Sequence, residues 1–318
     1  MLRPNNRRVL TLVTHKERIA LLRFLQPRYW LIWPLLALAR GIARLPYRWQ
    51  MRLGRALGRL ALLFSRRRKR IAIINLDLCL PQLSTRQRKR LLRRHFESFC
   101  MGLIEVIISW WVADERLKTL EQIEGLQHLQ DAFKKGKGVI LLSAHFTSLE
   151  IGGRLLARHC PFHVVYRRNE NPLIEHFMRR SRDLHFDKAI PRDDIRGMIR
   201  SLRENKAVWY AADQNYGRKY SVFAPFFGVQ ASTHTATSRI AKVSGAPVVP
   251  FFTQRRADGK GYRLILLPPL KNFPSADPLN DTTRINALIE AQVRQVPEQY
   301  FWTHRRFKHR PPGIERLY

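Results

Sequence analysis

The sequence predicts an α/β sandwich preceded by an N-terminal membrane-associated helical region. Beyond Leu120, apolar segments rich in β-branched and aromatic residues alternate with segments of helical periodicity, a pattern typical of α/β folds. Upstream of residue 70, arginine and apolar residues alternate at helical spacing, which indicates helices at a membrane surface. We therefore divide the 318 residues into an anchor and basic amphipathic helix (1–70) and an α/β domain (71–318).

The first predicted element is an apolar stretch, residues 29–39, rimmed by tyrosine, tryptophan and arginine. It is shorter than the ~20 apolar residues of a full span, and Arg40 and Arg44 interrupt its extension. Snorkelling arginines and an aromatic belt would still let it span the bilayer or lie deep in one leaflet. We predict a single N-terminal transmembrane anchor here; a cleaved signal peptide and an ordinary buried helix are the alternatives.

A basic amphipathic helix is predicted at residues 51–64, running into the cluster at 66–70. The formal net charge of +34 requires an anionic partner, either nucleic acid, an anionic membrane or a polyphosphorylated substrate. Basic clusters bind nucleic acid in many proteins, but no nucleic-acid fold signature accompanies this one. The adjacent apolar anchor favours membrane lipids as the partner, and we expect no nucleic acid.

The remaining elements follow from periodicity and caps. Ser84 is the predicted N-cap of a long helix that ends near Trp111, and Gly245 ends a later helix. The predicted strands cover 138–144, 162–166, 207–211, 248–252 and 262–267, and the predicted helices 149–158, 172–184, 194–204, 235–243 and 284–296.

His145 and Glu150 are the candidate catalytic pair. They are separated by four residues and follow the strand at 138–144, whose carboxyl end is where open α/β sheets bind ligands. A neutral imidazole can take a proton from a hydroxyl, and a carboxylate fixes its tautomer and stabilises the imidazolium. No serine or cysteine signature lies beside them, so we predict direct transfer to a hydroxyl without a covalent intermediate. Spacing alone would also fit a helix-capping histidine and a surface glutamate.

Several other chemistries are disfavoured. The three cysteines, Cys79, Cys100 and Cys160, are scattered and form neither a disulfide framework nor a zinc site. The chain lacks the Gly-x-Ser-x-Gly elbow of many hydrolases and a third ligand beside His145 and Glu150. We therefore expect no metal and no cofactor.

Six segments, in the right order, resemble the late acyltransferases of lipid A biosynthesis, a family of the lysophospholipid acyltransferase superfamily. They are residues 27–31, 144–152, 165–173, 208–217, 258–262 and 297–308. Glutamate at position 150 is similar to the lauroyl branch of that family, whereas the myristoyl branch tends to have aspartate.

The resemblance implies a glycerolipid-acyltransferase-like α/β sandwich. It also implies transfer of an acyl chain from acyl carrier protein to a 3-hydroxyacyl hydroxyl of the Kdo-bearing lipid A precursor, in lipopolysaccharide biosynthesis. The enzyme would lie at the bacterial inner membrane, its catalytic domain facing the cytoplasm. His145 would be the general base, held by Glu150. Backbone N–H groups at the start of the following helix would stabilise the oxyanion.

Three further residues are candidates for substrate binding. Arg167 and Arg182 would hold phosphate or orient the ester, because guanidinium binds such groups bidentately; a solvated basic face is the alternative. Asp213, at a predicted strand end, would orient the acceptor sugar or form a turn. For the basic tail block at 304–306, headgroup contact and sealing of the fold are both open.

Two other functions remain as alternatives. One is a lysophospholipid or glycerolipid acyltransferase, which would share the histidine–carboxylate pair but use a glycerol acceptor. The other is a basic nucleic-acid-binding protein, suggested by charge alone. Neither the acyl chain length nor the acceptor position follows from the sequence.

Overall fold

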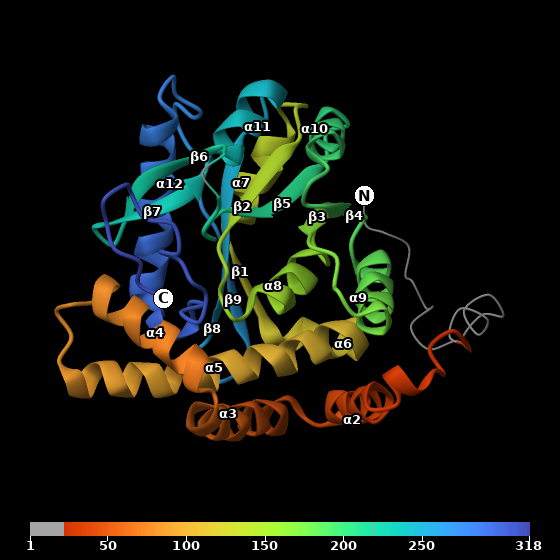
Figure 1. Cartoon of the computed structure of the whole chain (residues 1–318). Helices are drawn as coiled ribbons and strands as arrows, with labels where there is room; N and C mark the ends of the chain where they lie inside the picture. Colours follow the sequence, from red (N-terminus) through yellow and green to blue (C-terminus); the bar gives the residue numbers. More distant parts are fainter. Residues whose placement is uncertain (1–21, 218) are drawn as a thin grey trace.

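A seven-stranded sheet forms the centre of the computed structural model, which describes residues 22–217 and 219–318. The strand order is β1-β9-β8-β2-β5-β3-β4, and neighbours are parallel except β8 and β9 (Figure 1). The strands are β1 (Glu121–Glu124), β2 (Val139–Ser143), β3 (Phe162–Tyr166), β4 (Lys188–Pro191), β5 (Ala207–Ala211), β8 (Val248–Arg255) and β9 (Tyr262–Leu266). A separate antiparallel hairpin joins β6 (Ser221–Phe226) and β7 (Val229–His234).

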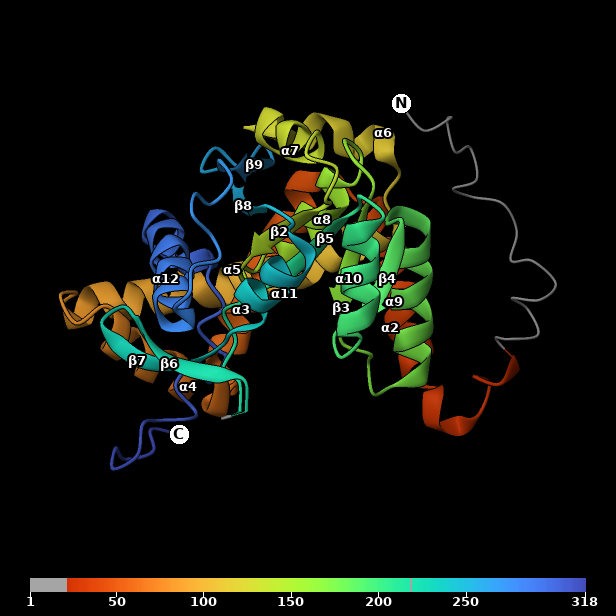
Figure 2. The same ribbon diagram turned by 90° about the horizontal axis from the view of Figure 1, so that it is seen from above.

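Helices cover both faces of the sheet, so the central strands β2 and β8 are buried along their whole length. Along β2, Ile140 and Leu142 belong to one hydrophobic cluster and Val139 and Leu141 to the other, as the two-residue period of a strand requires. The first cluster includes α10 (Ile195–Arg203), α11 (Ala236–Ser244) and α12 (Pro278–Gln295); the second includes α7 (Leu126–Phe133) and α8 (Leu149–Leu156). Seen from above, α12 and the hairpin lie on the opposite side of the molecule from β4 and α9 (Pro172–His185) (Figure 2).

The N-terminal helices form a layer across one end of the sheet (Figure 1). They are η1 (Pro27–Tyr29), α2 (Ile32–Arg44), α3 (Tyr47–Phe64), α4 (Arg66–Cys79) and α5 (Thr85–Trp111), followed by the short α6 (Asp114–Leu117) and η2 (Lys118–Leu120). Glycines allow α3 to lie directly on α5, since a Cβ at Gly58 would lie 2.4 Å from the Phe96 carbonyl oxygen. The layer therefore belongs to the same packed body as the sheet.

The transmembrane anchor predicted at residues 29–39 is not found in the described part of the chain. Residues 22–217 and 219–318 contain no helix that is both long and apolar enough to cross a bilayer. The apolar stretch instead forms η1 and the 13-residue α2, which at 1.5 Å per residue is about 20 Å long, against ~30 Å of hydrocarbon. The basic cluster begins α4, so the boundary predicted after residue 70 falls inside that helix.

All five predicted strands and the helices that connect them are confirmed, most within one or two residues. Ser84 closes a capping box with Gln87, and Gly245 has the left-handed φ of 69° expected after a helix. Strands β1 and β4 and the β6–β7 hairpin were missed, as was the early start of α12 at Pro278. The two single strands have four residues each, too few for a clear alternation of polar and apolar side chains.

Candidate active site

The register of two neighbouring strands brings His145 and Asp213 together. Strands β2 and β5 are parallel and adjacent, with Ser143 opposite Ala211. His145 and Asp213 each lie two residues beyond the end of their strand, at the same edge of the sheet, so they are neighbours. The two side chains meet although 68 residues separate them in the chain.

The Asp213 carboxylate orients both the backbone and the ring of His145. The backbone N–H of His145 donates to the two carboxylate oxygens at 3.1 and 3.0 Å, and Nδ1 lies 2.6 Å from Oδ1. Burial alone would raise the pKa of Asp213, but the charge of His145 and its hydrogen bonds outweigh burial and lower the pKa to about 2. An ionised carboxylate only accepts, so Nδ1 is the donor and Nε2 of the neutral ring carries the free lone pair.

Residues 144–148, between β2 and α8, form the loop that carries His145, and the C-terminal tail (residues 297–308) holds this His145 loop in place. The backbone N–H of Phe301 donates to the His145 carbonyl at 3.0 Å, and that of Thr147 donates to the Gln299 carbonyl at 2.7 Å. Between them, Tyr300 packs edge-on against Phe146, with ring centroids 5.8 Å apart. Burial and the nearby charge of Asp213 raise the pKa of Tyr300 well above its usual value, so its hydroxyl stays protonated.

Glu150 was expected to hold His145, and the structure gives that position to Asp213. Helix α8 begins at Leu149, so Glu150 lies in its first turn, and its Oε2 is 3.7 Å from Nη2 of Arg182. Within the described residues, no hydrogen bond joins Glu150 to His145. The cause is the strand order, which puts the end of β5 beside the end of β2.

Arg182 is a buried arginine with unused hydrogen-bonding capacity. Its side chain is 9% exposed, and its guanidinium stacks on the ring of Tyr166 at 4.8 Å from the centroid. Both Nε and Nη1 are buried and have no hydrogen-bond partner in the described part of the chain. Unsatisfied buried donors are costly, so this guanidinium is suited to bind an oxygen-rich group.

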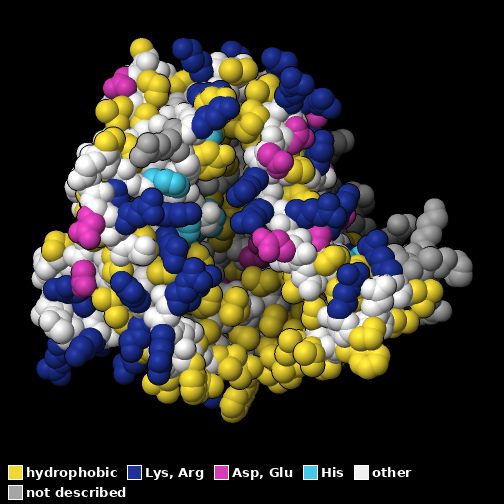
Figure 3. All heavy atoms as spheres, viewed as in Figure 1, with side chains coloured by type: hydrophobic (Ala, Val, Ile, Leu, Met, Phe, Trp, Pro, Cys, Tyr) yellow, Lys and Arg dark blue, Asp and Glu magenta, His cyan; other side chains and the backbone are white. Residues whose placement is uncertain are grey.

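His145 lines a large cavity of about 2380 Å³ (Figure 3). Arginines outnumber carboxylates in the lining by nine to three. The arginines are Arg23, Arg28, Arg167, Arg168, Arg179, Arg180, Arg192, Arg196 and Arg239; the carboxylates are Glu175, Asp183 and Asp193. The predicted residue Arg167 is among them, exposed and 3.0 Å from Glu170. The cavity therefore offers an anionic ligand a strongly positive surface beside the histidine.

Three tail and strand-end residues have structural contacts. Asp213 is 2% exposed and engaged with His145, and its role in orienting the acceptor sugar stays a prediction. Arg306 is buried and donates to the Ser232 carbonyl and to Thr233, and so seals the fold. Burial lowers the pKa of His304 to about 4, and its Nε2 accepts from the N–H of Asn215.

The N–H groups expected to stabilise an oxyanion are largely engaged. Phe146 donates to the Ala144 carbonyl, Thr147 to Gln299 and Leu149 to Phe146, at 2.7 to 3.0 Å. These three groups therefore hold the loop in shape. As for metals, residues 22–217 and 219–318 contain no group of three or more histidine, cysteine or acidic side chains that could hold one.

The family profile described as "Bacterial lipid A biosynthesis acyltransferase" matches residues 19–309. The chain belongs to this family. It is 41% identical over 295 residues to the lipid A biosynthesis lauroyltransferase of Escherichia coli K12, covering 92% of this chain and 96% of that protein. To the palmitoleoyltransferase of the same organism it is 39% identical over 296 residues, covering 93% and 96%.

The acyltransferase is thus an enzyme of lipid A biosynthesis, but its relatives differ in the acyl chain that their names specify. Identities of 41% and 39% do not separate the lauroyl from the palmitoleoyl relative. Among solved structures, the 1-acyl-sn-glycerophosphate acyltransferase of Thermotoga maritima aligns with a TM-score of 0.37 and 12% identity, covering 76% of this chain and 97% of that one. So weak a likeness has no bearing on the site.

Proposed function

We propose that this acyltransferase moves a fatty acyl chain from an acyl carrier protein thioester to a 3-hydroxyacyl hydroxyl of the Kdo-bearing lipid A precursor. The observation that carries the proposal is the His145–Asp213 pair at the wall of an arginine-lined cavity. A general base beside a cationic cavity suits a hydroxyl acceptor that carries phosphates and acidic sugars.

His145 is the general base of the proposed reaction. Nε2 takes the proton of the acceptor hydroxyl while the oxygen attacks the thioester carbonyl carbon. The tetrahedral intermediate then collapses, the carbon–sulfur bond breaks, and the imidazolium returns the proton to the leaving thiolate. The products are an acyloxyacyl ester and the free thiol of the carrier. The Asp213 carboxylate accepts the hydrogen bond from Nδ1–H throughout and stabilises the imidazolium.

Glu150 and Arg182 form the second proposed part of the site. Nε and Nη1 of Arg182, which have no partner among the described residues, suit an ester or phosphate oxygen, and the carboxylate of Glu150 orients the guanidinium from 3.7 Å. Arg167, which is exposed at the cavity, suits a phosphate of the incoming precursor. Glu150 thus stays in the proposed site, with Arg182 rather than His145 as its partner.

The N-terminal layer is the proposed contact with the inner membrane, on the cytoplasmic side. Eight large apolar side chains of α2, α3 and the link between η1 and α2 are each more than half exposed: Trp30, Leu31, Leu35, Leu38, Trp49, Leu60, Leu63 and Phe64. Hydrophobic side chains form a broad area along the lower edge of Figure 3, with lysine and arginine side chains beside it. An exposed apolar face flanked by cations favours insertion at an anionic membrane surface, with the helices parallel to it.

The test is acyl transfer from a panel of acyl carrier protein thioesters to a radiolabelled Kdo-bearing precursor, with lysophosphatidate as a second acceptor. Wild type, His145→Ala and Glu150→Ala are compared with His159→Ala, a histidine paired to Glu121 outside the cavity. We expect an acyloxyacyl product that His145→Ala reduces by roughly 10²–10⁴ and His159→Ala leaves unchanged.

Product on lysophosphatidate alone would refute the proposed acceptor. Product that survives His145→Ala would refute the proposed base. The donor giving the highest kcat/KM would identify the acyl chain, which the relatives leave open.

A further inference from the structure

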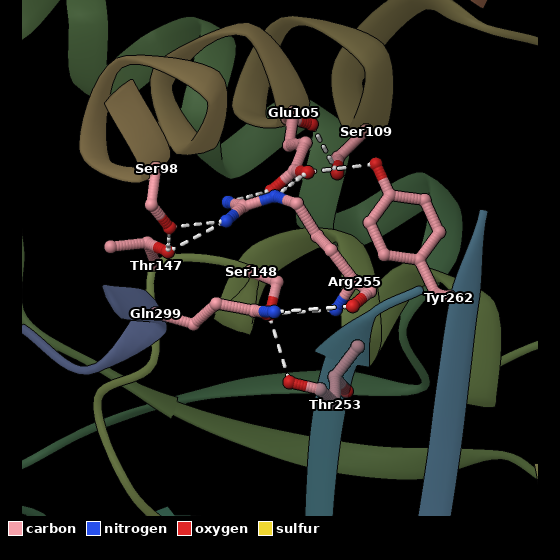
Figure 4. Close-up of polar contacts among 9 residues, drawn as sticks. All are labelled: Ser98, Glu105, Ser109, Thr147, Ser148, Thr253, Arg255, Tyr262 and Gln299. Atoms are coloured by element: carbon pink, nitrogen blue, oxygen red, sulfur yellow. Dashed lines mark hydrogen bonds and ion pairs between the residues drawn. The ribbon is translucent and has the colours of Figure 1, made fainter. Parts of the chain in front are cut away.

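A buried ion pair joins the N-terminal layer to the sheet close to the His145 loop (Figure 4). Arg255 ends β8, and its guanidinium binds the Glu105 carboxylate of α5 through both Nε and Nη2. Tyr262 of β9 donates to the same carboxylate at 2.8 Å. Burial acts on both partners: it raises the pKa of the Glu105 carboxyl despite the nearby guanidinium, whereas for Arg255 the Glu105 carboxylate outweighs burial and raises the pKa of the guanidinium.

The remaining nitrogen of Arg255 reaches the His145 loop. Nη1 donates to the Thr147 hydroxyl at 2.9 Å and to the Ser98 hydroxyl at 2.6 Å, and these two hydroxyls are 2.7 Å apart. Thr147 is two residues from His145. Arg255 therefore uses one side of its guanidinium for Glu105 and the other for the loop.

Two further contacts hold Thr147 at the same place. The Gln299 side chain makes two hydrogen bonds to the Arg255 backbone, at 2.7 and 3.1 Å, while its own carbonyl accepts from Thr147. Helix α5 approaches so closely at Gly102 that a Cβ there would lie 2.3 Å from the Thr147 carbonyl oxygen. Ser98, Gly102 and Glu105 share one face of α5, at spacings of four and three residues.

We propose that Arg255 is a positioning residue that fixes the His145 loop against α5, through Thr147 and with Glu105 as its counter-charge. The proposal rests on the proposed role of His145. A general base must be held within about 0.5 Å of its productive position, and small misplacements from remote changes can cost about a hundredfold in rate. The network supplies that restraint from inside the protein, without touching the substrate.

Thr147→Val is the decisive variant, because it removes the loop hydroxyl and leaves Arg255 paired to Glu105 and Ser98. We expect kcat to fall about tenfold with KM for both substrates unchanged, since the hydrogen bonds of the Thr147 hydroxyl to Arg255 and to Ser98 are lost. Amide hydrogen exchange in residues 145–152 should quicken by a similar factor. Thr147→Ser, which keeps the hydroxyl, should restore both. Ser109→Ala is the control, because Ser109 bonds only the backbone carbonyl of Glu105 in this cluster.

A double-mutant cycle with Arg255→Lys tests whether Arg255 acts through Thr147. Lysine keeps the charge opposite Glu105 but lacks the second guanidinium nitrogen that reaches Thr147. Because both substitutions then remove the same contact, kcat of the Thr147→Val, Arg255→Lys variant should be only slightly below that of the worse single variant. Additive losses would overturn the proposal. So would wild-type kcat and exchange in Thr147→Val, or equal losses in Ser109→Ala. The exchange measurement needs no substrate, so it decides the proposal even if the lipid A precursor is not acylated.

Discussion

Asp213→Asn is the substitution that most directly tests the proposed His145–Asp213 pair. Asparagine has the same shape, and its carbonyl oxygen can still accept from the His145 backbone. Its amide, however, puts a donor where Nδ1 now donates. The ring would then carry its proton on Nε2, the nitrogen that must receive the proton of the acceptor hydroxyl.

The expected loss in kcat is roughly 10²–10⁴, the range for removing a general base or its orienting carboxylate. Stability should fall as well. The Asp213 pKa is lowered from 3.8 to about 2, which corresponds to about 2.4 kcal/mol of stability. A lowered carboxyl pKa stabilises the fold above about pH 4, and this contribution disappears as the pH falls from about 4 through 2. The stability difference between wild type and variant should therefore shrink over that window.

The measurement is kcat for acyl transfer at neutral pH, together with urea unfolding followed by circular dichroism. Asp187→Asn is the matched control, because Asp187 pairs with His163 at 3.4 Å where β3 and β4 meet, outside the cavity. Asp213→Asn with kcat within threefold of wild type would refute the assignment of His145 and Asp213 as the catalytic pair.

Three further outcomes are expected. Glu150→Gln and Arg182→Met should each reduce kcat/KM by about tenfold or more. The double variant should have a kcat/KM only slightly below that of the worse single variant, and additive losses would show that the two residues act independently. Replacing Leu63 and Phe64 by serine should weaken binding to anionic vesicles by about a hundredfold or more, since burial of each contributes about 1.5–3 kcal/mol. Unchanged sedimentation with vesicles would exclude the α3 face from the membrane contact. The pKa of the partly buried His304 is lowered to about 4, so the unfolded chain takes up a proton at a higher pH than the folded chain does. Stability should therefore decrease by about 3 kcal/mol as the pH falls from 6.5 to 4, and His304→Gln should show a smaller decrease in urea midpoints.

Local patterns were enough to locate most of the α/β body. The strand at β2 is a continuous apolar run because both of its faces are covered, and the caps of α5 and α11 are encoded by Ser84 and Gly245 themselves. The N-terminal apolar stretch was predicted to span the bilayer or to lie deep in one leaflet, and residues 22–217 and 219–318 contain no helix able to span. Its composition is equally compatible with a short helix. Hydropathy cannot distinguish apolar residues that contact lipid from those that pack on another helix, as one side of α2 and α3 packs on α5.

Short segments and the total charge were enough to predict the family, the place of His145 at a strand end and an anionic partner, because each prediction depends on residues close together in the chain or on composition. Which carboxylate faces His145 follows from the tertiary structure. Strand order and register place Asp213 there, 68 residues away, and leave Glu150 beside Arg182. The same holds for Arg255 and Glu105, 150 residues apart, whose pairing creates no local pattern. Contacts between distant residues are set by how the sheet assembles, and a single chain's spacing does not record that assembly.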